Sequence, residues 1–376
     1  MNWPIPNIPH KKVLNPPSKK FWLTVLFVLV GSGTSITIFL FHARTFLDVF
    51  INGLLPSLLI WFCFLGVALF RYEQSSNVAI LWDIQTQYTK TQWQRWAMWQ
   101  RPIIANVIIC PELKGSLALT GALPDIPAYP QKGRGLHTKF ATLNAKFYFL
   151  DKEIEDQVSD YRNILYDIVV LTTKNHDIQL VSQAVYRQWD LIPAFLSSAD
   201  DFFSGKESRK IQGLTLIITL QDWPNSREVE YSEFISAKLI CSKETIKSYS
   251  LNAQAGVGRF LHSESLTQSL DVLVEYNNLK SSDIKCVWLT GIEEKAQIEL
   301  AQHAHSNKWS LPPRHPFLVI NHSFGPPGPL SFPTSLSLIT EAAIQSEEAQ
   351  LLICGNRDGT YSICLVTGML FYDGKN

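Results

Sequence analysis

The chain has 376 residues, with 33 Lys or Arg against 33 Asp or Glu, so its formal net charge at pH 7 is zero. No basic stripe follows residue 71, and this balance argues against a nucleic-acid partner. The six cysteines show no CxxC spacing, which fits reduced thiols in the cytosol and excludes a zinc knuckle or a disulfide framework.

Two apolar runs, residues 21–41 and 49–70, contain no Asp, Glu, Lys or Arg. A helix rises about 1.5 Å per residue, so about 20 apolar residues cross a hydrocarbon layer of about 30 Å. We therefore predict two transmembrane helices after a tail of residues 1–20. A cleaved signal peptide is the alternative for the first run, but that run is long, lacks a small-x-small cleavage site and is followed at once by the second.

Positive charges set the predicted orientation. Four lysines precede the first run and Arg71 follows the second, whereas the connector offers only Arg44 against Asp48. The positive-inside rule then puts both termini in the cytoplasm, as expected for a multi-pass protein of the bacterial inner membrane. The uncharged runs argue against an ion path or a transporter, which need ionisable groups within the membrane.

Both runs contain small residues, at positions 31–35 and at Gly53 and Gly66. Small residues allow helix backbones to approach closely, so we expect the two spans to pack on each other. A face for dimerisation or for a partner helix is the alternative.

A tryptophan-rich segment, residues 71–110, follows the membrane. Trp93, Trp96 and Trp99 recur at three-residue steps and share one broad helical face. Two hypotheses remain open for this face. It contacts the lipid headgroups, where Trp is favoured, or it packs on the domain that follows.

Residues 111–376 are predicted to form a cytosolic α/β domain with a layered, largely buried sheet, and no internal repeat is evident. Helical patterns fall at residues 265–276, 293–304 and 335–346, and residues 123–136 form a long surface loop rich in Pro and Gly. The predicted strands are residues 103–109, 167–172, 214–220, 234–241, 287–290, 317–320, 351–354 and 361–366.

Common catalytic motifs are missing from the sequence. It has no phosphate-binding GxxxxGK[ST] loop, no GxSxG nucleophile elbow, no HExxH motif and no GxGxxG motif after a strand. His303 and His305 point to different sides of the predicted helix, which argues against a metal site. We predict neither a metal nor a cofactor.

Residues 321–328 read Asn-His-Ser-Phe-Gly-Pro-Pro-Gly. This stretch resembles the glycine-histidine-threonine-x-glycine-alanine-alanine-glycine motif of β-ketoacyl synthases, which have a thiolase-like fold. His322, Gly325 and Gly328 match the histidine and two glycines of the motif, and the resemblance implies that they bind substrate. Residues 233–241, 266–279 and 285–299 fall in the order of the family's strand, helix and strand–helix elements, so the resemblance covers residues 211–366.

The sequence also departs from that family. The family uses a cysteine nucleophile and two histidines to attack a thioester and hold the oxyanion. No cysteine occurs between Cys110 and Cys241, where the nucleophile is expected, and Trp288 to Gly291 stand where the family carries its first histidine. The resemblance therefore implies a site in which His322 is vestigial and no condensation occurs.

We therefore expect a non-catalytic scaffold or adaptor, not an enzyme, that holds a protein client at the inner membrane. Its plan is similar to that of accessory proteins of bacterial type VI secretion clusters. Two alternatives stay open: an acyl-binding or acyl-transferring enzyme that uses a thiolase-like site, and a membrane-associated sensor or regulator. The lipid bilayer and a protein client are the expected partners, and the sequence leaves homo-oligomerisation open.

Overall fold

The computed structural model describes residues 3–6, 8–120, 123–196, 203, 213–223, 231–356 and 358–370. The chain divides into two compact units. One is Ile5–Gln92, here called the helical unit. The other, here called the body, comprises Trp93–Asn376 together with Met1–Pro4.

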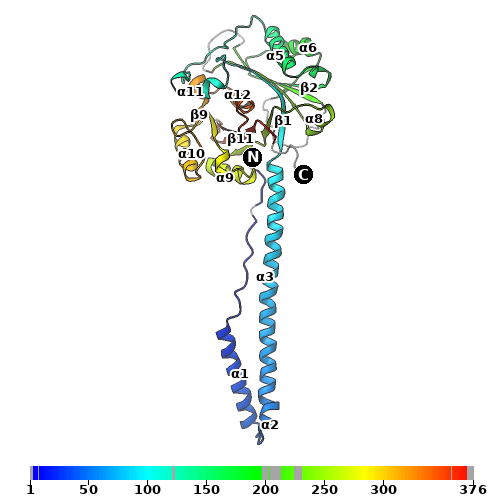
Figure 1. Ribbon diagram of the computed structural model, residues 1–376, viewed down its shortest axis with the longest axis vertical. Helices are drawn as coiled ribbons and strands as arrows, with labels where there is room; N and C mark the ends of the chain where they lie inside the picture. The colour runs from blue at the N-terminus through cyan, green and yellow to red at the C-terminus, as the bar shows by residue number, and fades with distance from the viewer. Residues whose placement is uncertain are drawn as a thin grey trace. The chain divides into compact units, whose positions relative to one another are not determined.

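Two long helices dominate the helical unit (Figure 1). Helix α1 spans Lys19–Phe39 and begins where the Ser18 hydroxyl accepts a hydrogen bond from the Phe21 amide. After the short helix α2 (Phe46–Val49) and a π-helical turn (Phe50–Leu54), helix α3 runs over Leu55–Ala97. By length and composition, two helical segments could cross a membrane, and only 6% and 11% of their most apolar windows are buried. Their apolar side chains are therefore exposed, unlike those of a core helix.

Helix α1 packs on the π-helical turn and on the start of α3 at a crossing of small residues. A Cβ added at Gly33 would lie 2.0 Å from Ser57 Oγ, and one added at Gly53 would lie 2.7 Å from Thr37 Oγ1. Among the described residues nothing lies within 4 Å of a Cβ added at Gly31 or Gly66. The predicted packing of the two apolar segments is confirmed, and Gly33 and Gly53 are the glycines that it uses.

The N-terminal tail runs beside α3. Trp82 Nε1 donates a 3.0 Å hydrogen bond to the Pro9 carbonyl, and the Leu14 amide donates to Ser75 Oγ at 3.1 Å. The Lys11 ammonium lies 5.7 Å from the centre of the Trp82 ring. The later tail residue, Leu14, pairs with the earlier helix residue, Ser75, so the tail runs antiparallel to α3.

The body contains one mixed sheet of eleven strands among the described residues. Along the sheet the order is β3-β2-β4-β5-β1-β6-β11-β10-β8-β9, with β7 beside β11. The strands are β1 (Gln100–Ile109), β2 (Leu165–Thr172), β3 (Ala194–Leu196), β4 (Leu214–Gln221), β5 (Phe234–Cys241), β6 (Ala255–Gly258), β7 (Leu261–Ser263), β8 (Cys286–Thr290), β9 (Leu318–Val319), β10 (Gln350–Gly355) and β11 (Tyr361–Thr367).

This strand order is a duplication. Without β7, and numbered within its own half, each half-sheet reads 3-2-4-5-1 from its outer edge, and the two halves join where β1 pairs with β6. In each half the first three strands of that order are parallel and the last two are antiparallel to their neighbours. The two halves share their topology and pattern of burial but not their residue identities, so the sequence shows no repeat.

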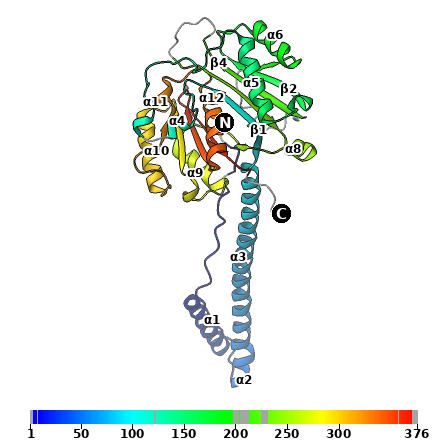
Figure 2. The same cartoon turned by 45° about the horizontal axis from the view of Figure 1, so that its top comes forward.

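Helices cover the sheet in layers, with α12 in the middle of the body (Figure 2). Along β4, Leu216 and Ile218 face a core cluster that includes α5 and α6, whereas Ile217 faces a second cluster that includes α12. The remaining α-helices lie at the surface or beside the loops. The helices of the body are α4 (Leu117–Thr120), α5 (Leu143–Gln157), α6 (Ile178–Trp189), α8 (Lys243–Tyr249), α9 (Leu266–Tyr276), α10 (Glu294–Ser306), α11 (Ile320–Phe324) and α12 (Ser331–Ser346).

Hydroxyl residues allow α12 to be buried. Thr334, Ser337 and Thr340 each donate to the carbonyl four residues earlier, at 2.9, 3.0 and 2.6 Å. Their hydroxyls are therefore satisfied within the helix and do not need water. The predicted strand at residues 317–320 shrinks to β9, because Ile320 already begins α11. The sequence analysis missed β3, β6 and β7, which are short, and helices α5, α6 and α8.

Candidate functional site

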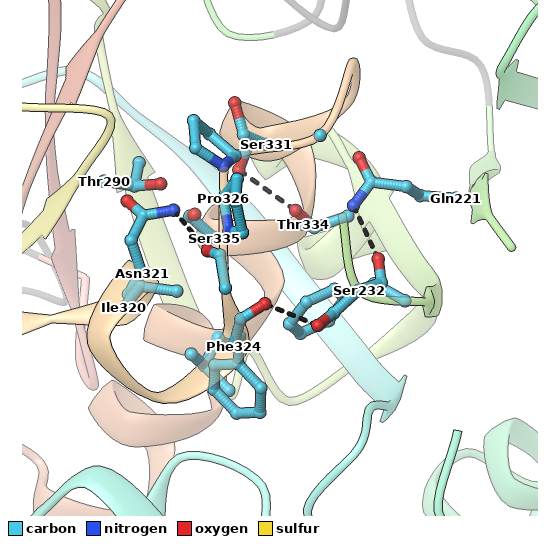
Figure 3. A pocket seen from close by; sticks show the side chains of 15 residues that line it. Gln221, Ser232, Thr290, Ile320, Asn321, Phe324, Pro326, Ser331, Thr334 and Ser335 are labelled. Atoms are coloured by element: carbon cyan, nitrogen blue, oxygen red, sulfur yellow. Dashed lines mark hydrogen bonds between the residues drawn. The ribbon is translucent and has the colours of Figure 1, made fainter. Parts of the chain in front are cut away.

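A small pocket lies where the first turns of α12 meet the ends of β4 and β8. The chain leaves β9, forms α11 and turns through residues 325–328 before α12 begins at Ser331. Figure 3 shows the side chains that surround the pocket. Its enclosed volume is about 20 Å³. The lining residues are Gln221, Ser232, Phe234, Thr290, Ile320, Asn321, Phe324, Gly325, Pro326, Pro327, Gly328, Ser331, Thr334, Ser335 and Leu338.

Two side-chain amides fix the shape of this pocket. Asn321 Oδ1 accepts a 2.6 Å hydrogen bond from the Gly291 amide, and Asn321 Nδ2 donates to the Gly325 carbonyl at 2.9 Å. Gln221 Nε2 donates to the Ser232 carbonyl at 3.1 Å, and Gln221 Oε1 accepts from the Leu330 amide at 2.8 Å. Asn321 and Gln221 thereby tie the loop before α12 to both half-sheets.

Ser335 is a polar group of the pocket that is available to a ligand. Its side chain comes from the second turn of α12 and the residue is 3% exposed. Among the residues that the structure describes, no hydrogen-bond partner is found for its hydroxyl. The N-terminal N–H groups of a helix favour negative charge, and α12 begins at this pocket. The Ser335 hydroxyl is therefore a hydrogen-bond donor at the N-terminal end of this helix.

The structure separates the three residues that the sequence analysis assigned to substrate. Gly325 and Gly328 line the pocket, but the His322 side chain is exposed and does not line it. His322 contributes its carbonyl, which accepts a 2.7 Å hydrogen bond from the Tyr129 amide. The side chain that does face the pocket is that of its neighbour Asn321. The sequence offered no signal for this, because the orientation depends on how α11 enters the loop.

Gly325 and Gly328 lie where another part of the chain approaches their backbone too closely for a Cβ atom. Gly325 has φ +74°, and a Cβ there would lie 2.5 Å from the Lys132 carbonyl oxygen. A Cβ at Gly328 would lie 2.4 Å from Gln221 Oε1. The predicted surface loop of residues 123–136 therefore lies against the loop that carries Gly325, and its residues 124–136 are here called the covering loop.

The covering loop is held by hydrogen bonds to the start of β5. The Arg134 amide donates to Ser232 Oγ at 2.9 Å, and the Leu136 amide donates to Glu233 Oε2 at 3.0 Å. The Arg134 guanidinium pairs with Glu112 and lies 4.2 Å from the centre of the Tyr129 ring. These contacts hold the covering loop against the segment that carries Gly325, which lines the pocket.

The thiols close to the pocket are not activated. Cys354 is paired in register with Thr290, a lining residue. Burial raises the pKa of Cys354 to about 12, although a hydrogen bond with Ser331 acts in the opposite direction. A cysteine nucleophile needs a lowered pKa. Within the interval between Cys110 and Cys241, where the family's nucleophile is expected, residues 121–122, 197–202, 204–212 and 224–230 lie outside the described residues.

A buried ionic cluster lies beside Gln221. The Asp222 carboxylate contacts the Lys146 ammonium, and its Oδ1 lies 2.6 Å from His176 Nε2. Burial alone would raise the pKa of Asp222, but His176 and Lys146 hold it below its usual value. In the described parts of the chain no three His, Cys, Asp or Glu side chains converge to hold a metal ion.

The three tryptophans assigned to the membrane interface, Trp93, Trp96 and Trp99, belong to the body. Trp96 lies edge-on to Trp93 and to Trp3, with ring centres 5.4 and 5.6 Å apart. The Arg259 guanidinium lies 4.1 Å from the centre of the Trp96 ring and 4.8 Å from that of Trp99. These contacts place the rings beside Trp3 and Arg259, and contact of this face with lipid headgroups stays a prediction.

No protein-family model and no curated protein matches the chain. Among solved structures, one similar structure is AntDE:AntF, a type II PKS acyl-carrier protein in complex with its ketosynthase bound to the hexaketide. The TM-score is 0.53 at 8% identity, over 72% of this chain and 99% of that chain. Another is 3-oxoacyl-[acyl-carrier-protein] synthase III from Aquifex aeolicus, with TM-score 0.43 and 13% identity over 71% and 99%. A variant of OleA from Xanthomonas campestris, with cerulenin, has TM-score 0.48 and 9% identity over 73% and 98%.

The body therefore has a thiolase-like fold, built on a mixed α/β sheet. The likeness covers 72% of the chain, so it extends beyond the predicted residues 211–366. The prediction that the chain is not an enzyme is contradicted, because the structure with TM-score 0.53 that shares its fold contains a ketosynthase. The comparisons support neither the scaffold role nor a relation to type VI secretion.

Proposed function

We propose that the chain is an acyl-binding or acyl-transferring protein that takes acyl thioesters at the pocket before α12. The observation that carries this proposal is the pocket itself. It is lined by hydroxyl and amide groups and lies at the N-terminus of a buried helix, within a fold shared with a ketosynthase complex. A thioester carbonyl fits those donors, because its oxygen gains negative charge when the carbonyl carbon is attacked.

In this proposal the Ser335 hydroxyl donates to the thioester carbonyl, while Asn321 keeps the loop in place. The enclosed volume of about 20 Å³ is room for one or two water molecules, which need about 10–15 Å³ each in this measure. An acyl chain therefore enters only when the covering loop or residues 325–328 move aside. The contact between Lys132 and Gly325 is the one that has to open.

The membrane attachment belongs to the same proposal. Two exposed apolar segments, in α1 and α3, form the anchor. Trp3 is buried in the body, where its Nε1 donates a 3.1 Å hydrogen bond to the Phe260 carbonyl. The N-terminus and the body then lie on one side of the bilayer, as a two-span hairpin requires. The positive-inside rule makes that side the cytoplasm.

The test of acyl binding uses the full chain in detergent micelles with an acyl-N-acetylcysteamine thioester. Calorimetry measures binding, and intact mass and free-thiol release measure transfer. Ser335→Ala should weaken binding about tenfold, the value of one hydrogen bond of about 1–1.5 kcal/mol. His322→Ala is the matched control and should leave binding unchanged because that side chain is exposed.

Two results would contradict this proposal. One is the lack of any binding or turnover by the wild-type chain across short and long acyl thioesters. The other is equal binding by the wild type and the Ser335→Ala variant. For the anchor, reporters fused ahead of Met1 and behind Asn376 should both respond from the cytoplasm, and reporters on opposite sides would refute the hairpin.

A further inference from the structure

A lysine is buried beneath α12. Lys238 lies on β5 and is 3% exposed. Its Nζ donates to the Ser337 hydroxyl and, at 3.3 Å, to the Pro333 carbonyl. Ser337 Oγ in turn lies 2.7 Å from Ser236 Oγ. The amine is thus held only by neutral groups on the first two turns of the helix that forms the pocket.

No acid compensates this lysine among the described residues. The elements around it are β1, β4 and α12, and the neighbours opposite it in the sheet are the uncharged Asn106 and Ile217. The charged and titratable groups on or directly beside those elements have other partners or lie at the far ends. They are Arg101, Cys110, Asp222, Glu233, Cys241, Glu341 and Glu347. Asp222 is bound to Lys146 and His176, Glu233 to the amides of Trp223 and Leu136, and Glu341 to the amide of Ser116. Glu347 lies at the far, C-terminal end of α12.

A positive charge at this place is unfavourable for two reasons. Burial removes its hydration without supplying a counter-ion. The N-terminal end of α12 also carries the positive pole of the helix dipole, which repels a cation. The free amine avoids both effects and keeps its hydrogen bonds to α12.

We propose that Lys238 is a pH-sensitive support for α12: as a free amine it holds the helix on β5, and as an ammonium ion it weakens that packing. The same helix supplies Ser331, Thr334, Ser335 and Leu338 to the pocket. Acidification therefore loosens one wall of the pocket. This inference does not depend on which ligand the pocket binds.

The direction of the pH dependence follows from the burial. Burial lowers the pKa of Lys238 to about 7, against about 10.4 for an unfolded lysine. Between these values the unfolded chain carries a proton that the folded body lacks, so stability rises with pH. One proton corresponds to a tenfold change in the unfolding equilibrium constant per pH unit. Below pH 7 both states are protonated, and this contribution becomes constant.

The test is urea unfolding of the full chain in detergent between pH 6 and pH 9.5. Compared with Lys238→Met, the wild type should show an additional slope approaching tenfold per pH unit above pH 7.5. The variant should also be the more stable of the two at pH 7. Lys295→Met, at an exposed position on α10, is the matched control and should keep the wild-type slope.

A second measurement uses only the wild type, so it tests the proposal even if Lys238→Met does not fold. Hydrogen exchange of peptides from α12, corrected for the intrinsic effect of pH, should be faster at pH 6 than at pH 9. Equal protection of α12 at both pH values would overturn the proposal. Parallel pH dependences of the wild type and Lys238→Met would overturn it as well.

Discussion

Gly325→Ala tests whether the covering loop closes the pocket through Gly325. This residue has φ +74° and ψ −169°, a backbone conformation that is almost confined to glycine. An alanine Cβ there would lie 2.5 Å from the Lys132 carbonyl oxygen and 2.9 Å from its carbon. Because both atoms belong to the backbone, no side-chain rotation relieves the clash.

The cost of this substitution has two parts. The backbone conformation costs about 1–3 kcal/mol for a residue with a Cβ. Displacing the covering loop also removes the hydrogen bond from the Tyr129 amide to the His322 carbonyl, which is worth about 1 kcal/mol. The total is about 2–4 kcal/mol, which lowers Tm by about 4–8 °C for a domain of this size.

The matched control is Gly359→Ala. Gly359 has φ +79°, but among the described residues nothing lies within 4 Å of an added Cβ. The Gly359→Ala substitution therefore costs only the free energy of the unfavourable backbone conformation, without a clash. Thermal unfolding and hydrogen exchange of residues 124–136 should both be more affected in Gly325→Ala. Equal loss of Tm in the two variants, with unchanged exchange of the covering loop, would refute the reasoning.

Two further predictions concern the helix crossing and the buried ion cluster. Gly33→Leu should separate α1 from α3 and lower the unfolding temperature of the helices, followed by circular dichroism in detergent, because Ser57 fills the space. Gly31 faces open space in the described structure, so Gly31→Leu should leave the unfolding temperature unchanged. Equal effects of the two substitutions would contradict the packing. Lys146→Met should lower stability by about 2 kcal/mol, since it removes a hydrogen bond to a buried charge. The lowered pKa of Asp222 contributes stability that is lost as pH falls through the folded pKa. The variant raises that folded pKa, so its acid-unfolding midpoint should move to higher pH, and an unchanged midpoint would count against the pairing.

Local sequence patterns predict much of the fold but little of the candidate site. The apolar runs, the strands at residues 214–220 and 234–241 and the closing hairpin are strong patterns, because each buries a continuous apolar segment. Short strands such as β6 and β7 were not predicted, because three or four residues are too few to show an alternation of apolar and polar side chains. The side chain of Asn321 faces the pocket and that of His322 does not, and a motif read along the chain cannot distinguish two neighbouring positions.

The sequence by itself determined that two long apolar helices precede an α/β domain, since hydrophobic length and alternation are local properties of the chain. Only the tertiary structure decided which residues meet. The duplicated sheet, the burial of Lys238 under α12 and the contact of Lys132 with Gly325 join positions about 100 to 200 residues apart. Such contacts depend on how packed elements exclude water and approach one another, and no local pattern encodes them.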